Sequence, residues 1–178
     1  MHTIVLGAGA LGSVISAYLT YAGEKVTLLA REPRATSLQA HGVAVTGVEE
    51  FTASVTVMAR PHDLGAADLL IVTVKTYDTE PALASVSHLR VGSVLSLQNG
   101  VLKNEQLAHY FGWEKTLGAS PLFSAQVTPA GLVHFTYHSG TALGEFSGAM
   151  SPRVQAIAAM LEHGGMRPVS VPQIRSVE

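Results

Sequence analysis

Short apolar runs alternate with segments of helical spacing along most of this 178-residue chain. The first apolar run ends at Leu6, and apolar side chains then recur from Leu11 to Ala22 at intervals of three and four residues. This spacing predicts a helix with one buried face. Residues 25–30 are predicted as a second strand, so a βαβ unit opens the chain. Further strands are predicted at 43–46, 51–58, 69–74, 94–97 and 116–120, and helices at 34–40, 80–88 and 103–111.

The last third of the sequence departs from this alternation. Apolar runs at 132–137 and 141–145 flank Ser139-Gly140, which predicts a β-hairpin with its turn there. Ser151 and Pro152 open a helix that ends before Gly164-Gly165, and 168–171 is predicted as a last strand. The whole pattern predicts an α/β fold of Rossmann type. Its sheet is doubly wound and mostly parallel, with helices on both faces and an antiparallel hairpin at one edge.

A GxGxxG turn lies directly between the first strand and the first helix. In dinucleotide-binding folds, the three glycines allow the tight turn, the close approach of a pyrophosphate and the packing of the helix on the strand. The free N–H groups and positive dipole end of the helix then stabilise phosphate charge. The alternative is a strand, turn and helix with no ligand. We predict that the turn binds a dinucleotide through Gly7, Ala8, Gly9, Ala10, Leu11 and Gly12.

The residue after the second strand decides the choice of cofactor, because an Asp or Glu about 20 residues beyond the glycines accepts from the ribose 2′-OH of NAD. Here that position is Arg31. A guanidinium can bind the 2′-phosphate of NADP with charged hydrogen bonds, whereas a carboxylate repels it. Arg31 therefore predicts NADP (NADPH). The alternative is a solvated surface arginine, with Glu32 or an Asp elsewhere left to serve NAD.

Two further candidates follow central strands, at the edge where open α/β sheets bind ligands. Lys75 comes after the apolar run that ends at Val74, and it can reach a phosphate, a carboxylate or a ribose. Gln98-Asn99-Gly100 comes after the next strand, and an amide there suits a ribose hydroxyl or a reacting carbonyl. The alternatives are a surface lysine and a plain Asn-Gly turn.

Composition limits the other function classes. The length fits one domain, and the formal charge of −2 gives no reason to expect nucleic acid or an anionic membrane as a partner. The absence of cysteine excludes disulfides and thiolate chemistry. No positive segment precedes the first apolar run, so a secretory signal is not predicted and a cytoplasmic protein is expected. His134 and His138 would share one face of a strand, but with no third ligand nearby we predict no metal site.

Taken together, these features resemble ketopantoate reductase (2-dehydropantoate 2-reductase) over essentially the whole chain. The matching segments are the glycine turn, Arg31, Lys75 at its strand end, Gln98-Asn99-Gly100 and the run 130–134. The resemblance implies that the glycine turn and Arg31 bind NADPH, and that Lys75 and Asn99 line the nicotinamide end. It implies hydride transfer to the C2 carbonyl of ketopantoate or a related 2-oxo acid.

The sequence departs from the family at its end. The family's proton donor is a lysine in a Trp-x-Lys run that opens a second, helical domain, and this chain stops at Glu178 before such a run. We therefore expect a cofactor domain at 1–172 and the start of a hinge at 173–178. The helical domain is expected to be absent, with no catalytic acid in the chain and possible homodimers through exposed apolar surface. A non-catalytic dinucleotide-binding module, or the cofactor half of another β-hydroxyacid-type dehydrogenase, remain alternatives.

Overall fold

The structure is a computed structural model that describes residues 1–176. Its helices are α1 (Ala10–Tyr21), α2 (Arg34–His41), α3 (Thr79–Val86), α4 (Lys103–Phe111) and α5 (Pro152–His163). Its strands are β1 (His2–Leu6), β2 (Lys25–Leu29), β3 (Val43–Gly47), β4 (Phe51–Ala53), β5 (Thr56–Met58), β6 (Ala66–Val72), β7 (Arg90–Ser96), β8 (Thr116–Val127), β9 (Val133–Gly144) and β10 (Pro168–Ser170). Short 3₁₀ turns lie at η1 (Pro61–Asp63), η2 (Thr76–Asp78) and η3 (Ile174–Ser176).

The strands form one curved sheet in the order β4-β3-β9-β8-β7-β6-β1-β2-β5, with β10 added beside β9. The five strands from β5 to β7 are mutually parallel, and β8 continues them in parallel with β7. The antiparallel pairs are β8 with β9 and β3 with β4. The predicted fold class is confirmed: a doubly wound α/β sheet, mostly parallel, with antiparallel pairing in one half.

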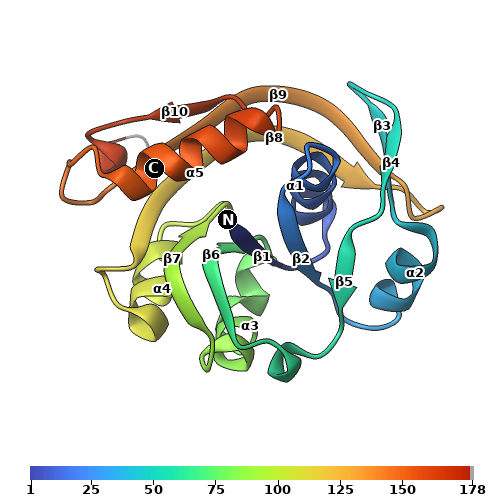
Figure 1. Cartoon of the computed structure of the whole chain (residues 1–178), viewed down its shortest axis with the longest axis horizontal. Helices are drawn as coiled ribbons and strands as arrows, with labels where there is room; N and C mark the ends of the chain where they lie inside the picture. Colours follow the sequence, from blue (N-terminus) through green and yellow to red (C-terminus); the bar gives the residue numbers. More distant parts are fainter. Residues whose placement is uncertain (177–178) are drawn as a thin grey trace.

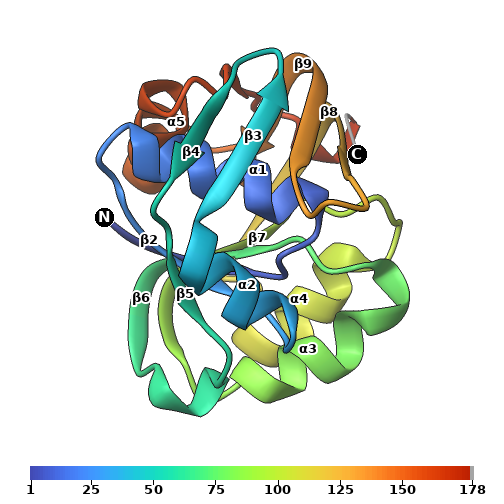
Figure 2. The ribbon, with the colours of Figure 1, turned by 90° about the vertical axis from the view of Figure 1, so that its right-hand side faces the viewer.

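Helices cover both faces of the sheet. Figure 1 shows β8 and β9 curving over α1, while α3 and α4 lie on the opposite side, as Figure 2 also shows. Strand alternation explains the two faces, because successive side chains point to opposite sides. On β1, Val5 joins the apolar cluster of α1 and α5, whereas Ile4 and Leu6 join that of α3 and α4. Helix α1 is buried over nearly its whole circumference as a result.

The predicted strand at 51–58 is wrong in one respect, because it is two strands with different partners. Residues of β4 pair antiparallel with β3, and residues of β5 pair parallel with β2 at the far edge of the sheet. Between them the chain bends at 54–55, where the backbone N–H of Val55 donates to the carbonyl of Ala53 (3.0 Å). This short link carries the chain from one half of the sheet to the other.

The predicted hairpin turn at Ser139-Gly140 is also wrong. These residues lie within β9, which runs without a break and pairs with β8 from Val133 to Gly144. The turn instead lies between β8 and β9, where the backbone N–H of Gly131 donates to the carbonyl of Thr128 (2.9 Å). Gly140 pairs with Leu122 next to a register shift. It therefore marks a bulge within a long strand rather than a turn.

The end of the described chain packs firmly on the domain. Ser151 caps α5 as predicted, with its hydroxyl accepting from the N–H of Val154. Arg153 donates through Nε and Nη2 to the two carboxylate oxygens of Glu145, at 2.7 Å each. Ile174, in the segment predicted to open a hinge, is buried. The boundary at 172 stays a prediction, and Val177 and Glu178 lie outside the described residues.

Candidate functional site

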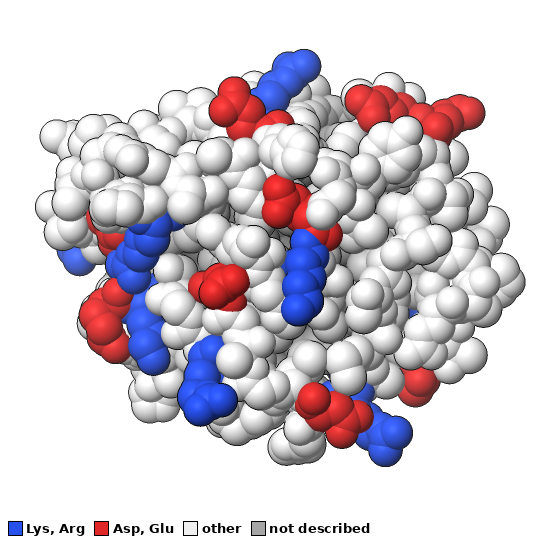
Figure 3. Space-filling model, viewed as in Figure 1, with Lys and Arg blue, Asp and Glu red and all other residues white. Residues whose placement is uncertain are grey.

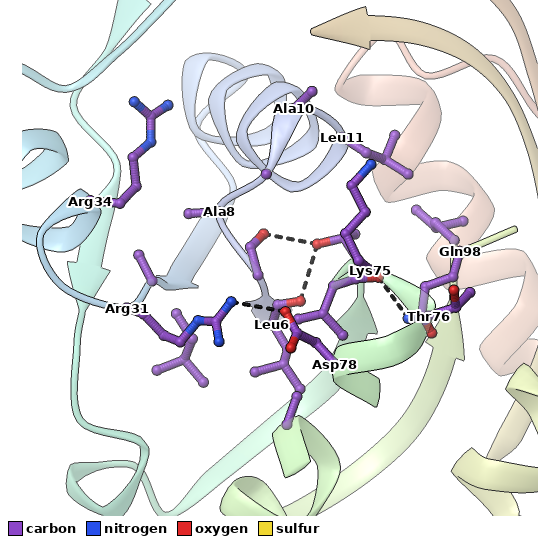
Figure 4. A pocket seen from close by; sticks show the side chains of 18 of the residues that line it. Leu6, Ala8, Ala10, Leu11, Arg31, Arg34, Lys75, Thr76, Asp78 and Gln98 are labelled. Atoms are coloured by element: carbon purple, nitrogen blue, oxygen red, sulfur yellow. Dashed lines mark hydrogen bonds and ion pairs between the residues drawn. The ribbon is translucent and has the colours of Figure 1, made fainter. Parts of the chain in front are cut away.

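A cleft of about 940 Å³ opens at the carboxyl ends of β1, β2, β6 and β7. Its lining contains eight of the nine predicted site residues: Gly7, Ala8, Gly9, Ala10, Leu11, Arg31, Lys75 and Asn99. The ninth, Gly12, lies beneath the turn within α1. The strand order explains this convergence, because β1 lies between β2 and β6, and β7 follows β6. Figure 4 shows these segments meeting around the first turn of α1.

The glycine turn is shaped by close packing at two of its glycines. Gly7 has a φ of +114°, and a Cβ there would lie 2.8 Å from Val74 Cγ1. A Cβ on Gly12 would overlap the carbonyl oxygen of Gly7 and the hydroxyl of Thr73. The Thr73 hydroxyl itself donates to the carbonyls of Leu6 (3.1 Å) and Gly7 (2.9 Å), so β6 holds the turn in place.

Gly9 differs from the other two, because a Cβ there would meet no atom within 4 Å. It is the N-cap of α1, its side of the turn faces the cleft, and no side chain caps the helix. The first turn of α1 contains no acidic residue. Its free N–H groups and positive dipole end are therefore available to an anion that enters the cleft.

Arg31 lies at the β2 side of the cleft with its side chain 85% exposed, and its Nη2 donates to Asp78 Oδ2 at 2.9 Å. Asp78 is the last residue of η2, which begins directly after Lys75 on the β6 side of the cleft. Its side chain is 26% exposed. Figure 4 shows this ion pair in front of Leu6, at the end of β1. Arg31 thus lies in the cleft as predicted, and its guanidinium is paired there with the carboxylate of Asp78.

Lys75 and Asn99 are exposed and line the cleft, and Figure 4 shows Lys75 extending toward the side on which Leu11 lies. Gln98, in contrast, is buried, and its amide is used within the protein. Its Nε2 donates to the carbonyl of Val74 (2.6 Å) and the hydroxyl of Thr79 (2.8 Å), and its Oε1 accepts from Ser96 (2.9 Å). Gln98 therefore fixes the connection between β6 and α3 that carries Lys75.

Arg34 is a second arginine on the cleft wall, at the start of α2. Its Nη1 donates to the carbonyl of Gly131 (2.9 Å), in the turn between β8 and β9. Burial lowers the pKa of Arg34 from its usual value. The side chain thus ties α2 to the far half of the sheet, and it lies at one side of the cleft (Figure 4).

Three residues that line the cleft were not predicted as site residues: Thr73, Asp78 and Arg34. Thr73 carries a weak signal, a hydroxyl residue at the end of an apolar strand beside the turn. Arg34 has none, because its partner Gly131 is 97 residues away. Asp78 is 47 residues from Arg31 and approaches it from another strand, so only the strand order brings the two together.

His134 and His138, the two histidines that were weighed as metal ligands, bond to different segments of the chain. His134 Nδ1 lies 3.2 Å from Thr46 Oγ1, and His138 Nε2 lies 2.9 Å from the carbonyl of Met166. Across residues 1–176, three or more His, Cys, Asp or Glu side chains nowhere gather as a metal would require. No helix in this part of the chain is long and apolar enough to cross a membrane. On the face drawn in Figure 3, acidic and basic side chains are interspersed.

Comparison with known proteins assigns the chain to a family. The sequence model described as ketopantoate reductase PanE/ApbA matches residues 3–148. The chain belongs to the ketopantoate reductase family. The 2-dehydropantoate 2-reductase of Archaeoglobus fulgidus is 35% identical over 170 residues, which cover 96% of this chain and 56% of that protein. The family resemblance predicted from the sequence is thereby confirmed.

Solved structures give the same assignment. The 2-dehydropantoate 2-reductase of Geobacter metallireducens GS-15 is 29% identical with a TM-score of 0.87, covering 96% of this chain and 58% of that one. D-mandelate dehydrogenase, solved with NADH and anilino(oxo)acetate, shares the fold with a TM-score of 0.89 at 20% identity, over 98% of this chain and 58% of that one. The chain thus spans somewhat more than half the length of these ketopantoate reductase family members.

Proposed function

We propose that this chain binds NADPH as the cofactor-binding part of a reductase that acts on ketopantoate or a related 2-oxo acid. The observation that carries the proposal is the uncapped N-terminus of α1, which opens at Gly9 into a cleft flanked by Arg31 and Lys75. A diphosphate fits this arrangement, because backbone N–H groups and a helix dipole meet it without a side chain in the way.

Each side of the cleft has a separate task in this proposal. The turn at 7–12 holds the pyrophosphate, Arg31 binds the 2′-phosphate, and Lys75 and Asn99 orient the nicotinamide end and the substrate carbonyl. NADPH, when bound, supplies the hydride. Gln98 keeps Lys75 in position through its bonds to the connection between β6 and α3.

We further propose that the 178-residue polypeptide on its own does not turn over ketopantoate. Reduction of a carbonyl needs a proton for the developing alkoxide as well as a hydride, and the resemblance implies that the proton donor belongs to the family's second, helical domain. Lys75 lies in the cleft, but the resemblance gives it a positioning role. Steady loss of NADPH absorbance with ketopantoate and the purified chain would contradict this proposal.

Binding is tested by calorimetric titration of the chain with NADPH and with NADH. We expect tighter binding of NADPH, and we expect Arg31→Ala to weaken NADPH binding about tenfold while changing NADH little, because an exposed charged hydrogen bond contributes about 1.4 kcal/mol. Arg90→Ala is the matched control, since Arg90 is exposed at the amino end of β7, whereas the cleft lies at the carboxyl end of that strand. An unchanged ratio of NADPH affinity to NADH affinity in Arg31→Ala would refute the role of Arg31.

A further inference from the structure

The ion pair between Arg31 and Asp78 joins the two sides of the cleft. Arg31 follows β2, Asp78 precedes α3, and β1 with its glycine turn lies between them. A ligand that the guanidinium of Arg31 binds near this position would therefore lie close to the carboxylate of Asp78. This inference rests on the proposed function, in which that ligand is the 2′-phosphate of NADPH.

Asp78 is the better fixed member of the pair. The backbone N–H of Asp78 donates to the carbonyl of Lys75 (2.8 Å). The next residue, Thr79, is buried, and its hydroxyl accepts from Gln98. The Arg31 side chain is 85% exposed, against 26% for Asp78. The guanidinium is thus free to turn toward a ligand, while the negative charge of Asp78 stays beside the site.

This arrangement has opposite effects on the two cofactors. A 2′-phosphate carries a charge of about −1.5 to −2 at neutral pH, so it competes with Asp78 for Arg31 and is repelled by the carboxylate. A 2′-OH is a donor, and Asp78 can accept from it, as an Asp or Glu does in NAD-binding folds of this type. The site therefore contains one residue that favours NADPH, Arg31, and one that favours NADH, Asp78.

We propose that Asp78 sets the discrimination between NADPH and NADH, by lowering the preference for NADPH that Arg31 alone would give. The determinant comes from η2, in the connection between β6 and α3, whereas the acidic residue of NAD-binding folds follows the second strand of the βαβ unit. The described side chains thus predict a modest preference in the wild type, which removal of one carboxylate makes strong.

The test is calorimetric titration of Asp78→Asn with both nucleotides. We expect NADPH to bind about tenfold tighter, because a unit charge a few ångströms from a phosphate at a water-exposed site contributes on that order. NADH should bind about threefold more weakly, because the amide of asparagine is a poorer acceptor than a carboxylate. The same comparison with 2′,5′-ADP and 5′-AMP should reproduce the shift, because these probes contain only the adenosine end.

Two variants serve as controls. Glu24→Gln removes a carboxylate that is 20% exposed and pairs with His163 (2.9 Å), at the start of β2, about 16 Å from the cleft end of that strand. It should leave the affinity ratio unchanged. Asp78→Ser repeats the loss of charge with a good helix N-cap residue, and no side-chain cap bond of Asp78 is lost in either variant.

The outcomes separate this inference from the proposed function. If the wild type binds neither nucleotide, the proposed function fails and this inference fails with it. If the wild type binds NADPH but both Asp78 variants keep its NADPH-to-NADH affinity ratio within twofold, only the role of Asp78 is overturned. An equal shift in Glu24→Gln would also overturn it, because the effect would then be one of net charge.

Discussion

Gly9 and Gly12 allow cofactor binding and folding to be tested separately within one turn. Gly9 has a φ of −70° and a ψ of −171°, an extended conformation that alanine adopts, and a Cβ there meets no atom within 4 Å. Alanine is a poorer N-cap than glycine, but it also restricts the unfolded chain. These effects oppose each other, so we expect Gly9→Ala to change the free energy of unfolding by less than about 1 kcal/mol, or Tm by less than about 4 °C.

The same substitution should remove most cofactor binding. The added methyl group would occupy the space through which a pyrophosphate approaches the N–H groups of α1. Loss of one or two charged hydrogen bonds at about 1.5 kcal/mol or more each should weaken NADPH binding by at least about 10- to 100-fold. Calorimetric titration measures the affinity, and thermal unfolding without cofactor measures the stability.

Gly12→Ala is the contrasting variant, because its Cβ would overlap backbone at Gly7 and the hydroxyl of Thr73. Separating α1 from β1 and β6 should reduce the free energy of unfolding by about 3 kcal/mol, which lowers Tm by about 6 to 12 °C. Binding of NADPH by Gly9→Ala within threefold of the wild type would refute a pyrophosphate at this helix end. A wild-type Tm for Gly12→Ala would refute the packing argument.

Three further substitutions test the supporting bonds. Gln98→Leu should lower the free energy of unfolding by about 2 kcal/mol or more, because it leaves the buried Thr79 and a strand-end carbonyl without their donor; chemical denaturation measures this loss. Thr73→Val removes the hydroxyl that holds the glycine turn and should weaken NADPH binding several-fold with about 1 kcal/mol lost in stability; unchanged affinity would mean that the turn holds its shape alone. Arg153 lowers the pKa of Glu145 from its usual value, so the pair stabilises the folded state at neutral pH and this contribution is lost as the pH falls through the lowered pKa. Glu145→Gln should therefore lower Tm at neutral pH and weaken its fall on acidification, and an unchanged profile of Tm against pH would contradict this.

The glycine turn and its helix could be predicted from the sequence because their determinants are local. The glycines, the apolar spacing of α1 and the strand before them all lie within about 25 residues, and helix α4 is found at the predicted residues 103–111. The predicted Ser151 cap is also a local feature, and it is confirmed by its bond to Val154. Local signals of this kind are the most reliable that a single sequence offers.

The errors arose where a partner strand decides the structure. Residues 51–58 have one apolar pattern, but their two halves pair with β3 and β2, and pairing is a tertiary choice. Gly140 and Gly131 both allow a turn, and only the extension of β8 to Val127 places it at the second. The sequence Thr128-Pro129-Ala130-Gly131 carries a turn signal of its own, as Ser139-Gly140 does, so local residue preference does not choose between them. The ion pair of Arg31 with Asp78 likewise depends on strand order, which composition and spacing do not reveal.

Because α1 is almost completely buried, binding of the proposed dinucleotide at its first turn would be coupled to cooperative unfolding of the domain. The helix is enclosed by β8, β9 and α5, so its amide protons are expected to exchange with solvent only when the core opens as a whole. A dinucleotide bound at such a helix protects the global native state, with a gain in free energy that grows as the logarithm of its concentration over Kd. The resistance of the whole domain to proteolysis should therefore report on occupancy of the cleft.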